Sequence, residues 1–141
     1  MDRSFFEWDP NKYSVSVPAM DREHQELIHL MNHLHELNQQ KSDKKVIVTA
    51  FENLLKYAEK HFQDEEAFFF SLPHYPLAQA HKKIHDDITN KLNDFFVKFK
   101  AQPSSQLPDD FFNFLKIWLS AHIAGIDKKY GEVAQYQKRS A

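Results

Sequence analysis

This chain contains two pairs of potential metal ligands, His61 with Glu65 and His81 with His85, and the two residues of each pair are four positions apart. Residues at this spacing lie over one another on an α-helix, about 6 Å apart along its axis. Two side chains from one helix can therefore reach the same metal centre. The spacing predicts that both segments are helical and that each presents one ligand face to the interior.

Apolar residues recur with a helical period in four stretches of the chain. These stretches are about 21–39, 43–70, 76–100 and 108–125. Asp21 and Ser42 or Asp43 are candidate N-caps, and Pro76 and Pro108 suit the first turn of a helix. Four amphipathic helices joined by short loops pack most simply as an all-α, up-down-up-down antiparallel four-helix bundle.

The two ends of the chain lack this period. We expect residues 1–18 to form an extended arm that lies on the bundle, with Phe5 and Trp8 as its anchors. Residues 126–141 should form a short C-terminal tail. The chain has 141 residues, so residues 1–141 form a single domain by the usual size prior.

The composition excludes several classes of function. A net charge of −2 supplies no basic surface for nucleic acid, and the lack of cysteine excludes disulfides, zinc–thiolate sites and iron–sulfur clusters. The acidic N-terminus is unlike a signal peptide, and no apolar run approaches the roughly 20 residues that span a bilayer. We therefore expect a cytoplasmic protein without membrane insertion, monomeric or weakly oligomeric. Its 13 phenylalanines predict an aromatic core.

The antiparallel order brings candidate ligands from all four helices to one end of the bundle. They are His24 near the start of the first helix, His61 and Glu65 near the end of the second, His81 and His85 near the start of the third, and His122 and Asp127 at the end of the fourth. Five histidines and two carboxylates would be costly in a Phe-rich core unless something bound them. The seven side chains therefore predict a site for two metal ions.

Helical geometry separates these residues from other histidines. His33 points roughly opposite to His24 at 100° per residue, so it should be solvated. His35 shares a stripe with His24 but lies about 16 Å along the axis, too far to join it. On a regular helix Asp127 would be rotated by about 140° from His122, so it would have to face a second ion or bridge the two.

At these residues the chain resembles the hemerythrin family, and within it the single-domain bacterial members. The resemblance covers nearly the whole chain, and all seven family ligand positions hold the expected residue types. The segments that carry it are 6–9, 20–24, 61–66, 81–85 and 118–130. Together these motifs form a specific match.

The resemblance implies two iron ions (Fe2+/Fe3+) joined by two carboxylates and by a solvent-derived oxo or hydroxo bridge. One ion would be held by His81, His85 and His122, the other by His24 and His61, with Glu65 and Asp127 as the bridging carboxylates. The second ion then has one imidazole fewer and an open position. Dioxygen should bind there reversibly, for oxygen carriage, storage or local supply.

Residues around the ligands are harder to interpret. Three apolar side chains could line a dioxygen pocket and exclude water, although ordinary core packing explains them equally well: Trp118, Leu119 and Ile123. Glu66 should point away from Glu65 and be solvated or act as a cap. Tyr130 is a candidate neighbour of the site from the tail.

Other functions remain open on sequence alone. A di-iron enzyme such as a peroxidase, an oxidase or a nitric-oxide-handling protein could use the same fold, and a metal-free or zinc-loaded bundle is a further alternative. No second acid or base is evident beyond the seven ligands, which favours oxygen binding over catalysis. A sensor would need a separate output partner, because 141 residues leave no room for an output module.

Overall fold

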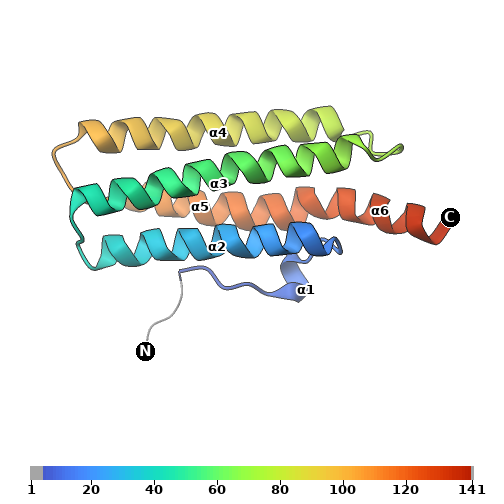
Figure 1. Cartoon of the computed structure of the whole chain (residues 1–141), viewed down its shortest axis with the longest axis horizontal. Helices are drawn as coiled ribbons and strands as arrows, with labels where there is room; N and C mark the ends of the chain where they lie inside the picture. The colour runs from blue at the N-terminus through green and yellow to red at the C-terminus, as the bar shows by residue number, and fades with distance from the viewer. Residues whose placement is uncertain (1–4, 141) are drawn as a thin grey trace.

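The computed structural model describes residues 5–140, with side chains to residue 136. Four rods run side by side in up-down-up-down order, which confirms the predicted all-α bundle (Figure 1). The rods are α2 (Pro18–Gln39), α3 (Lys44–Phe70), α4 (Ala78–Ala101) and α5 (Asp109–His122), the last continued by the π-helix η1 (Ile123–Asp127) and by α6 (Lys128–Ser140). None of the helices in the described part is long and apolar enough to cross a membrane.

The helices form where apolar side chains recur at helical spacing. Leu27, Met31 and Leu34 make one buried stripe on α2, and the facing helices contribute matching stripes. The ring centroids of Phe51 on α3 and Phe111 on α5 lie 4.7 Å apart, and both rings are fully buried. The core is therefore aromatic, and it fixes how the four rods sit against one another.

The arm contains a short helical turn instead of being extended throughout. Residues 1–18 were expected to be extended, but α1 (Pro10–Tyr13) begins directly after Asp9. The Asp9 side chain accepts a hydrogen bond from the backbone N–H of Asn11 (2.9 Å), and proline is favourable at the first helical position. Residues 1–4 of the predicted arm lie outside the described residues.

The first rod begins at Pro18 rather than at Asp21. Proline suits the first turn because its ring fixes φ and it lacks an N–H group that would otherwise be unpaired. Asp21 is not the N-cap. Its carboxylate instead accepts hydrogen bonds from Ser14 Oγ (2.6 Å) and from the backbone N–H of Val15 (2.8 Å). Asp21 therefore holds the arm against the bundle.

The third rod begins two residues later than predicted, at Ala78 instead of Pro76. The chain turns around Tyr75, whose side chain is buried and whose carbonyl accepts a hydrogen bond from the N–H of Ala78 (3.4 Å). The residue before a proline is disfavoured in helical conformation, so this turn precedes the helix. The turn also places the Tyr75 hydroxyl inside the bundle.

The predicted short tail, residues 126–141, is helical in its described part and extends the fourth rod. The fourth rod was predicted to end near residue 125, but it passes through η1 and continues as α6. Inward-facing residues continue at helical spacing after the π-helix, as the buried Asp127 and Tyr130 show. Residue 141 lies outside the described part.

Candidate metal centre

All seven candidate ligands lie in one cluster inside the bundle. Each of them is at most 5 % exposed, although all are polar. They come from every rod: His24 from α2, His61 and Glu65 from α3, His81 and His85 from α4, His122 from α5 and Asp127 from η1. The antiparallel order therefore brings these positions to the same end of the bundle.

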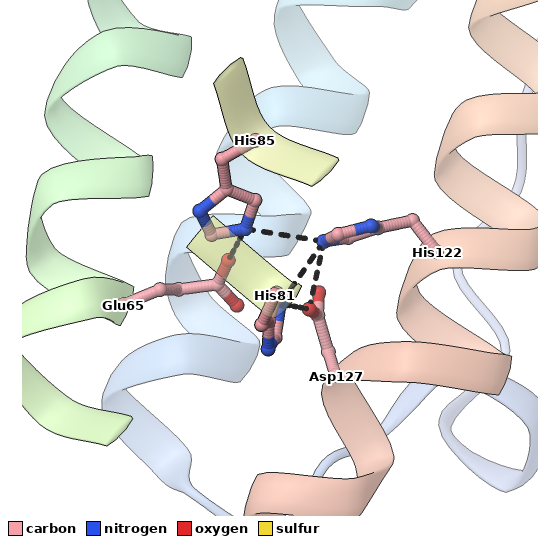
Figure 2. Close-up of side chains that lie close together, drawn as sticks. All are labelled: Glu65, His81, His85, His122 and Asp127. Carbon is pink, nitrogen blue, oxygen red and sulfur yellow. Dashed lines mark hydrogen bonds and ion pairs between the residues drawn. The ribbon is translucent and has the colours of Figure 1, made fainter. Parts of the chain in front are cut away.

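The cluster divides into two groups of donors that share both carboxylates. Within each group, one ligand atom per residue lies within 4.8 Å of all the others. The first group is Glu65, His81, His85, His122 and Asp127 (Figure 2), and the second is His24, His61, Glu65 and Asp127. The two carboxylates thus lie between three imidazoles on one side and two on the other.

Asp127 reaches the site because a π-helix forms immediately before it. In a π-helix, hydrogen bonds join residues five apart, which brings Asp127 to the same side as His122. Asp127 Oδ1 lies 2.9 Å from His122 Nε2 and 2.8 Å from His81 Nε2 (Figure 2). Its Oδ2 lies 3.1 Å from His24 Nε2. The irregular turn therefore lets one carboxylate face both groups.

Glu65 occupies the equivalent place on α3. Its Oε1 lies 3.1 Å from His61 Nε2 and 3.2 Å from His85 Nε2, and its Oε2 lies 3.1 Å from His24 Nε2. The hydroxyl of Tyr130, fully buried on α6, donates a hydrogen bond to Oε2 (2.6 Å). The structure thus brings Tyr130 to the site, as the sequence suggested, and joins it to a carboxylate shared by both groups.

Hydrogen bonds alone do not satisfy the cluster. Glu65 Oε1 and Asp127 Oδ2 are buried without a hydrogen-bond partner, although imidazole nitrogens lie 3.1 to 3.2 Å away. The Nε2 of His122 also faces two other Nε2 atoms, at 3.2 Å from His85 and 3.3 Å from His81. Imidazole nitrogens and carboxylate oxygens are common ligands of iron and zinc. The donor set therefore fits a bound metal pair, which would accept these unused lone pairs.

Opposite charges offset one another in the metal-free cluster. Burial alone would lower the pKa of His24, but the close contacts and the negative charge of Asp127 and Glu65 outweigh it and raise this pKa to about 10. Burial would raise the pKa of Glu65, but the charge of His61 and the close contacts of its carboxylate with His24, His61 and His85 hold this pKa well below its ordinary value. Glu65 is therefore ionised at neutral pH.

Three of the five imidazoles also contact polar side chains that do not belong to the cluster. The Nδ1 atom of His61 lies 2.8 Å from the Glu23 carboxylate, and that of His85 lies 2.9 Å from the Glu66 carboxylate. The Nδ1 atom of His81 lies 2.9 Å from the Tyr75 hydroxyl. These contacts leave Nε2 as the nitrogen directed into the cluster. They fix the ring orientation of ligand histidines in the way that is common at protein metal sites.

Glu66 was wrongly expected to be solvated or capping. It does diverge from Glu65 and stays partly exposed, but one of its carboxylate oxygens reaches His85 on the neighbouring helix. Glu23 and Tyr75 were not singled out from the sequence. A usable signal was present for the two glutamates, because each stands next to one of the seven clustered residues, and adjacent helical residues diverge by about 100° toward different neighbours.

The three candidate pocket residues are buried near His122. Trp118, Leu119 and Ile123 are between 1 and 5 % exposed, and Trp118 meets the ring of Phe62 at 5.8 Å. Phe62 in turn stacks on His85 with 4.0 Å between ring centroids. The clustered histidines therefore border an apolar, aromatic part of the core.

His33 and His35, which helical geometry excluded from the predicted site, lie outside the cluster. His33 is exposed on α2. The ring of His35 stacks on Phe5 of the arm with 4.5 Å between centroids. His35 therefore helps to hold the arm and makes no contact with the seven clustered side chains.

Comparison with known proteins places this cluster in a family. The family model described as the hemerythrin HHE cation binding domain matches residues 15–134. The chain belongs to the hemerythrin family. The match contains every one of the seven clustered residues, so the cluster lies in the part of the chain that hemerythrins share.

Named hemerythrins resemble the chain over most of its length. A bacteriohemerythrin of Clostridium acetobutylicum is 28 % identical over 130 residues, which cover 89 % of this chain and 98 % of that protein. A myohemerythrin of Theromyzon tessulatum is 30 % identical over 125 residues, covering 89 % and 90 %. A crystal structure of a wild-type hemerythrin superposes with a TM-score of 0.82 at 26 % identity, covering 91 % of this chain and 96 % of that one. The resemblance to bacterial hemerythrins is thereby confirmed.

Proposed function

We propose that this hemerythrin binds dioxygen reversibly at a pair of iron ions, for oxygen carriage, storage or local supply. Three imidazoles would hold one ion and two the other. Glu65 and Asp127 would bridge the ions beside a solvent-derived oxo or hydroxo group. The observation that carries the proposal is the division of the donors into two groups that share both carboxylates. When bound, the iron pair would supply the electrons for reversible dioxygen binding, and His24 and His61 would hold the ion that has fewer imidazole ligands.

The donor set itself supports the reversible function. Five imidazoles are neutral ligands, and only two carboxylates contribute negative charge. Ferritin-like di-iron sites are built from more carboxylates and are therefore more anionic. Less negative charge around the ions should favour the reduced iron pair over irreversible oxidation.

Apolar packing would protect the bound ligand. Leu119 lies one turn before His122 on α5, while Trp118 and Ile123 are buried beside the same face of the rod. We assign to these three side chains the exclusion of water and protons, which promote loss of a reduced centre. Small polar substitutions here should admit water without removing any ligand.

The titratable groups that touch the cluster favour binding over catalysis. Tyr130 donates to Glu65, and Glu23 and Glu66 hold Nδ1 atoms on the outer side of their histidines. Each of these groups is engaged with one of the seven side chains and is therefore not free to act as a general acid or base toward a ligand. Reversible binding needs no such group.

Iron content and an oxygen-dependent spectrum test the proposal together. The purified protein should contain about two iron ions per chain, and its visible spectrum should change under air and return after degassing. Rapid one-way oxidation with turnover of a reducing substrate would indicate a di-iron enzyme instead. Less than about one iron per chain would indicate a zinc-loaded or metal-free bundle.

A matched pair of histidine variants locates the iron. His61→Ala should lose iron and the oxygen-dependent spectrum, because His61 belongs to the smaller donor group. His33→Ala removes an exposed imidazole and should change neither measurement. Equal iron content in the two variants would contradict the proposed ligand set, provided that circular dichroism shows both to be helical.

A further inference from the structure

A line of alternating charges leads outward from His61 to solvent. Its Nδ1 lies 2.8 Å from Glu23 Oε1, and the second oxygen of Glu23 lies 3.8 Å from Lys60 Nζ. Lys60 in turn lies 2.8 Å from an oxygen of Asp64. The Glu23 side chain is 15 % exposed and that of Lys60 is 60 % exposed, so the line runs from the buried cluster to the surface.

An equivalent line starts at His85 in the other donor group. Its Nδ1 lies 2.9 Å from Glu66 Oε2, and Glu66 Oε1 lies 3.9 Å from Lys82 Nζ. Lys82 lies 3.2 Å from an oxygen of Asp86. The exposed fractions repeat the pattern, with 19 % for the Glu66 side chain and 44 % for that of Lys82.

The two lines are distributed evenly between the donor groups. Glu23 supports a histidine of the smaller group, and Glu66 supports a histidine of the larger group. The other histidines lack such support: His81 faces a neutral tyrosine hydroxyl, and the Nδ1 atoms of His24 and His122 are buried without a partner. Each group therefore has one imidazole that is held by a carboxylate.

This arrangement has a direct effect on metal ligation. An imidazole that donates its Nδ1–H to a carboxylate keeps the lone pair on Nε2, and the negative charge makes that nitrogen a stronger donor. A lysine on the far side of the carboxylate attracts the same negative charge and opposes the effect. The glutamate and the lysine should therefore act on metal affinity with opposite signs.

We propose that Glu23 and Glu66 are positioning residues, one for each ion, and that Lys60 and Lys82 moderate them. Each glutamate fixes its histidine in the tautomer that ligates through Nε2 and strengthens that histidine as a ligand. Each lysine limits this strengthening from the surface. The inference rests on the metal pair of the proposed function but is independent of dioxygen binding.

Competition between the full-length protein and a chelator for Co2+ tests whether the glutamates and the lysines change metal affinity in opposite directions. Glu23→Gln and Glu66→Gln should each lower affinity by at least about tenfold, because a lost carboxylate partner weakens the ligand it supported. Lys60→Met and Lys82→Met should raise affinity by about two- to fivefold, the range of a partly exposed ion pair. Glu26→Gln and Glu59→Gln alter exposed glutamates of the same two helices and serve as matched controls that should not change affinity.

A spectroscopic measurement separates positioning from a general loss of structure. In 15N NMR of the Zn2+-loaded protein, His61 and His85 should be protonated at Nδ1. Glu23→Gln should shift the His61 signal alone and Glu66→Gln the His85 signal alone. Thermal unfolding of the metal-free variants reports any loss of folding separately from metal affinity.

The possible results distinguish a failure of the positioning role from a failure of the proposed dioxygen binding. Glutamate variants within twofold of the wild type, or lysine variants that lower affinity like the glutamate variants, would overturn the positioning role and leave dioxygen binding standing. A wild-type chain that binds no Co2+ at the cluster would overturn both. Normal Co2+ behaviour without reversible oxygenation of the iron form would overturn only the proposed function.

Discussion

Glu65 shows how much of this site depends on single contacts. One of its oxygens lies between two imidazole nitrogens from different donor groups, and the other accepts the Tyr130 hydroxyl hydrogen bond. The carboxylate is fully buried, so every missing partner leaves an ionised oxygen that is poorly compensated. Tyr130, although it is not among the seven candidate ligands, should therefore contribute to the stability of the cluster.

Replacing Tyr130 with Phe tests this contribution. The variant keeps the buried ring but removes the donor 2.6 Å from Glu65 Oε2, so the metal-free protein should lose about 1–3 kcal/mol of unfolding free energy. Urea unfolding in the presence of a chelator measures the change. Tyr136→Phe removes an exposed hydroxyl and should have almost no effect. A loss of similar size in both variants would show that the hydrogen bond to Glu65 is not the cause.

The sequence predicted some residues of the site and not others for a physical reason. His61 with Glu65 share a helix face because of the 3.6-residue period, so their proximity is local information. The contact between Glu23 and His61 joins two helices, and it depends on how those helices are rotated against each other. The same holds for Glu66, whose direction on α3 was predicted correctly but whose partner on α4 was not.

The arm and the last rod approach each other most tightly where Gly131 faces Val15. A Cβ atom added to Gly131 of α6 would lie 1.9 Å from the carbonyl oxygen of Val15, far inside van der Waals distance. Gly125 in η1 has open space at the same test position. The arm can therefore lie directly on α6 only because residue 131 has no side chain, whereas residue 125 is not restricted in this way.

Two alanine substitutions distinguish these glycines. Gly131→Ala should force the arm away from α6 and destabilise the protein by about 1–3 kcal/mol or more, as overpacking does. Gly125→Ala should be neutral or stabilise by up to about 1 kcal/mol, because alanine is the better helix former. Thermal unfolding measures both, and limited proteolysis near Val15 reports release of the arm. Equal stability of the two variants would show that the arm does not depend on this contact.

Irregular elements were the least predictable part of the fold. The amphipathic period of 21–39 and 43–70 is a long, repeated signal, and the structure has helices there with small shifts at the ends. The π-helix Ile123–Asp127 leaves no such signal, because one widened turn changes the phase of the pattern without changing its composition. The helical tail was missed for the same reason, since the phase shift at η1 hides the continuation of the rod.

At the scale of the whole molecule, the cluster ties four helices together through buried charge. Without metal, the carboxylates and imidazoles stabilise one another as ions and hydrogen-bond partners. With metal, the imidazoles have to be neutral to act as ligands, so protons and metal ions compete for the same nitrogens. The pH dependence of stability should therefore differ between the metal-free and the loaded protein.

The metal-free protein should be most stable from about pH 4.5 to 6.5. The pKa of His24 is raised from 6.5 to about 10, so its stabilising contribution is fully present below pH 6.5 and is lost as the pH rises to about 10. The pKa of Glu65 is held below its ordinary value, so its contribution is present above about pH 4.5 and is lost as the pH falls. Urea unfolding from below pH 4.5 up to pH 10 should show both losses of stability, an acidic limb from Glu65 and an alkaline limb from His24.

Metal loading should remove the alkaline limb. Bound Co2+ replaces the proton on His24, so the difference in stability between loaded and metal-free protein should grow from pH 6.5 to 10. His24→Gln should flatten the alkaline limb of the metal-free protein, whereas His33→Gln, which alters an exposed histidine, should leave it unchanged. Metal-free stability that stays constant between pH 6.5 and 10 would mean that the buried carboxylates do not hold His24 in its charged form. In that case the other imidazoles of the cluster would have to offset the buried carboxylates.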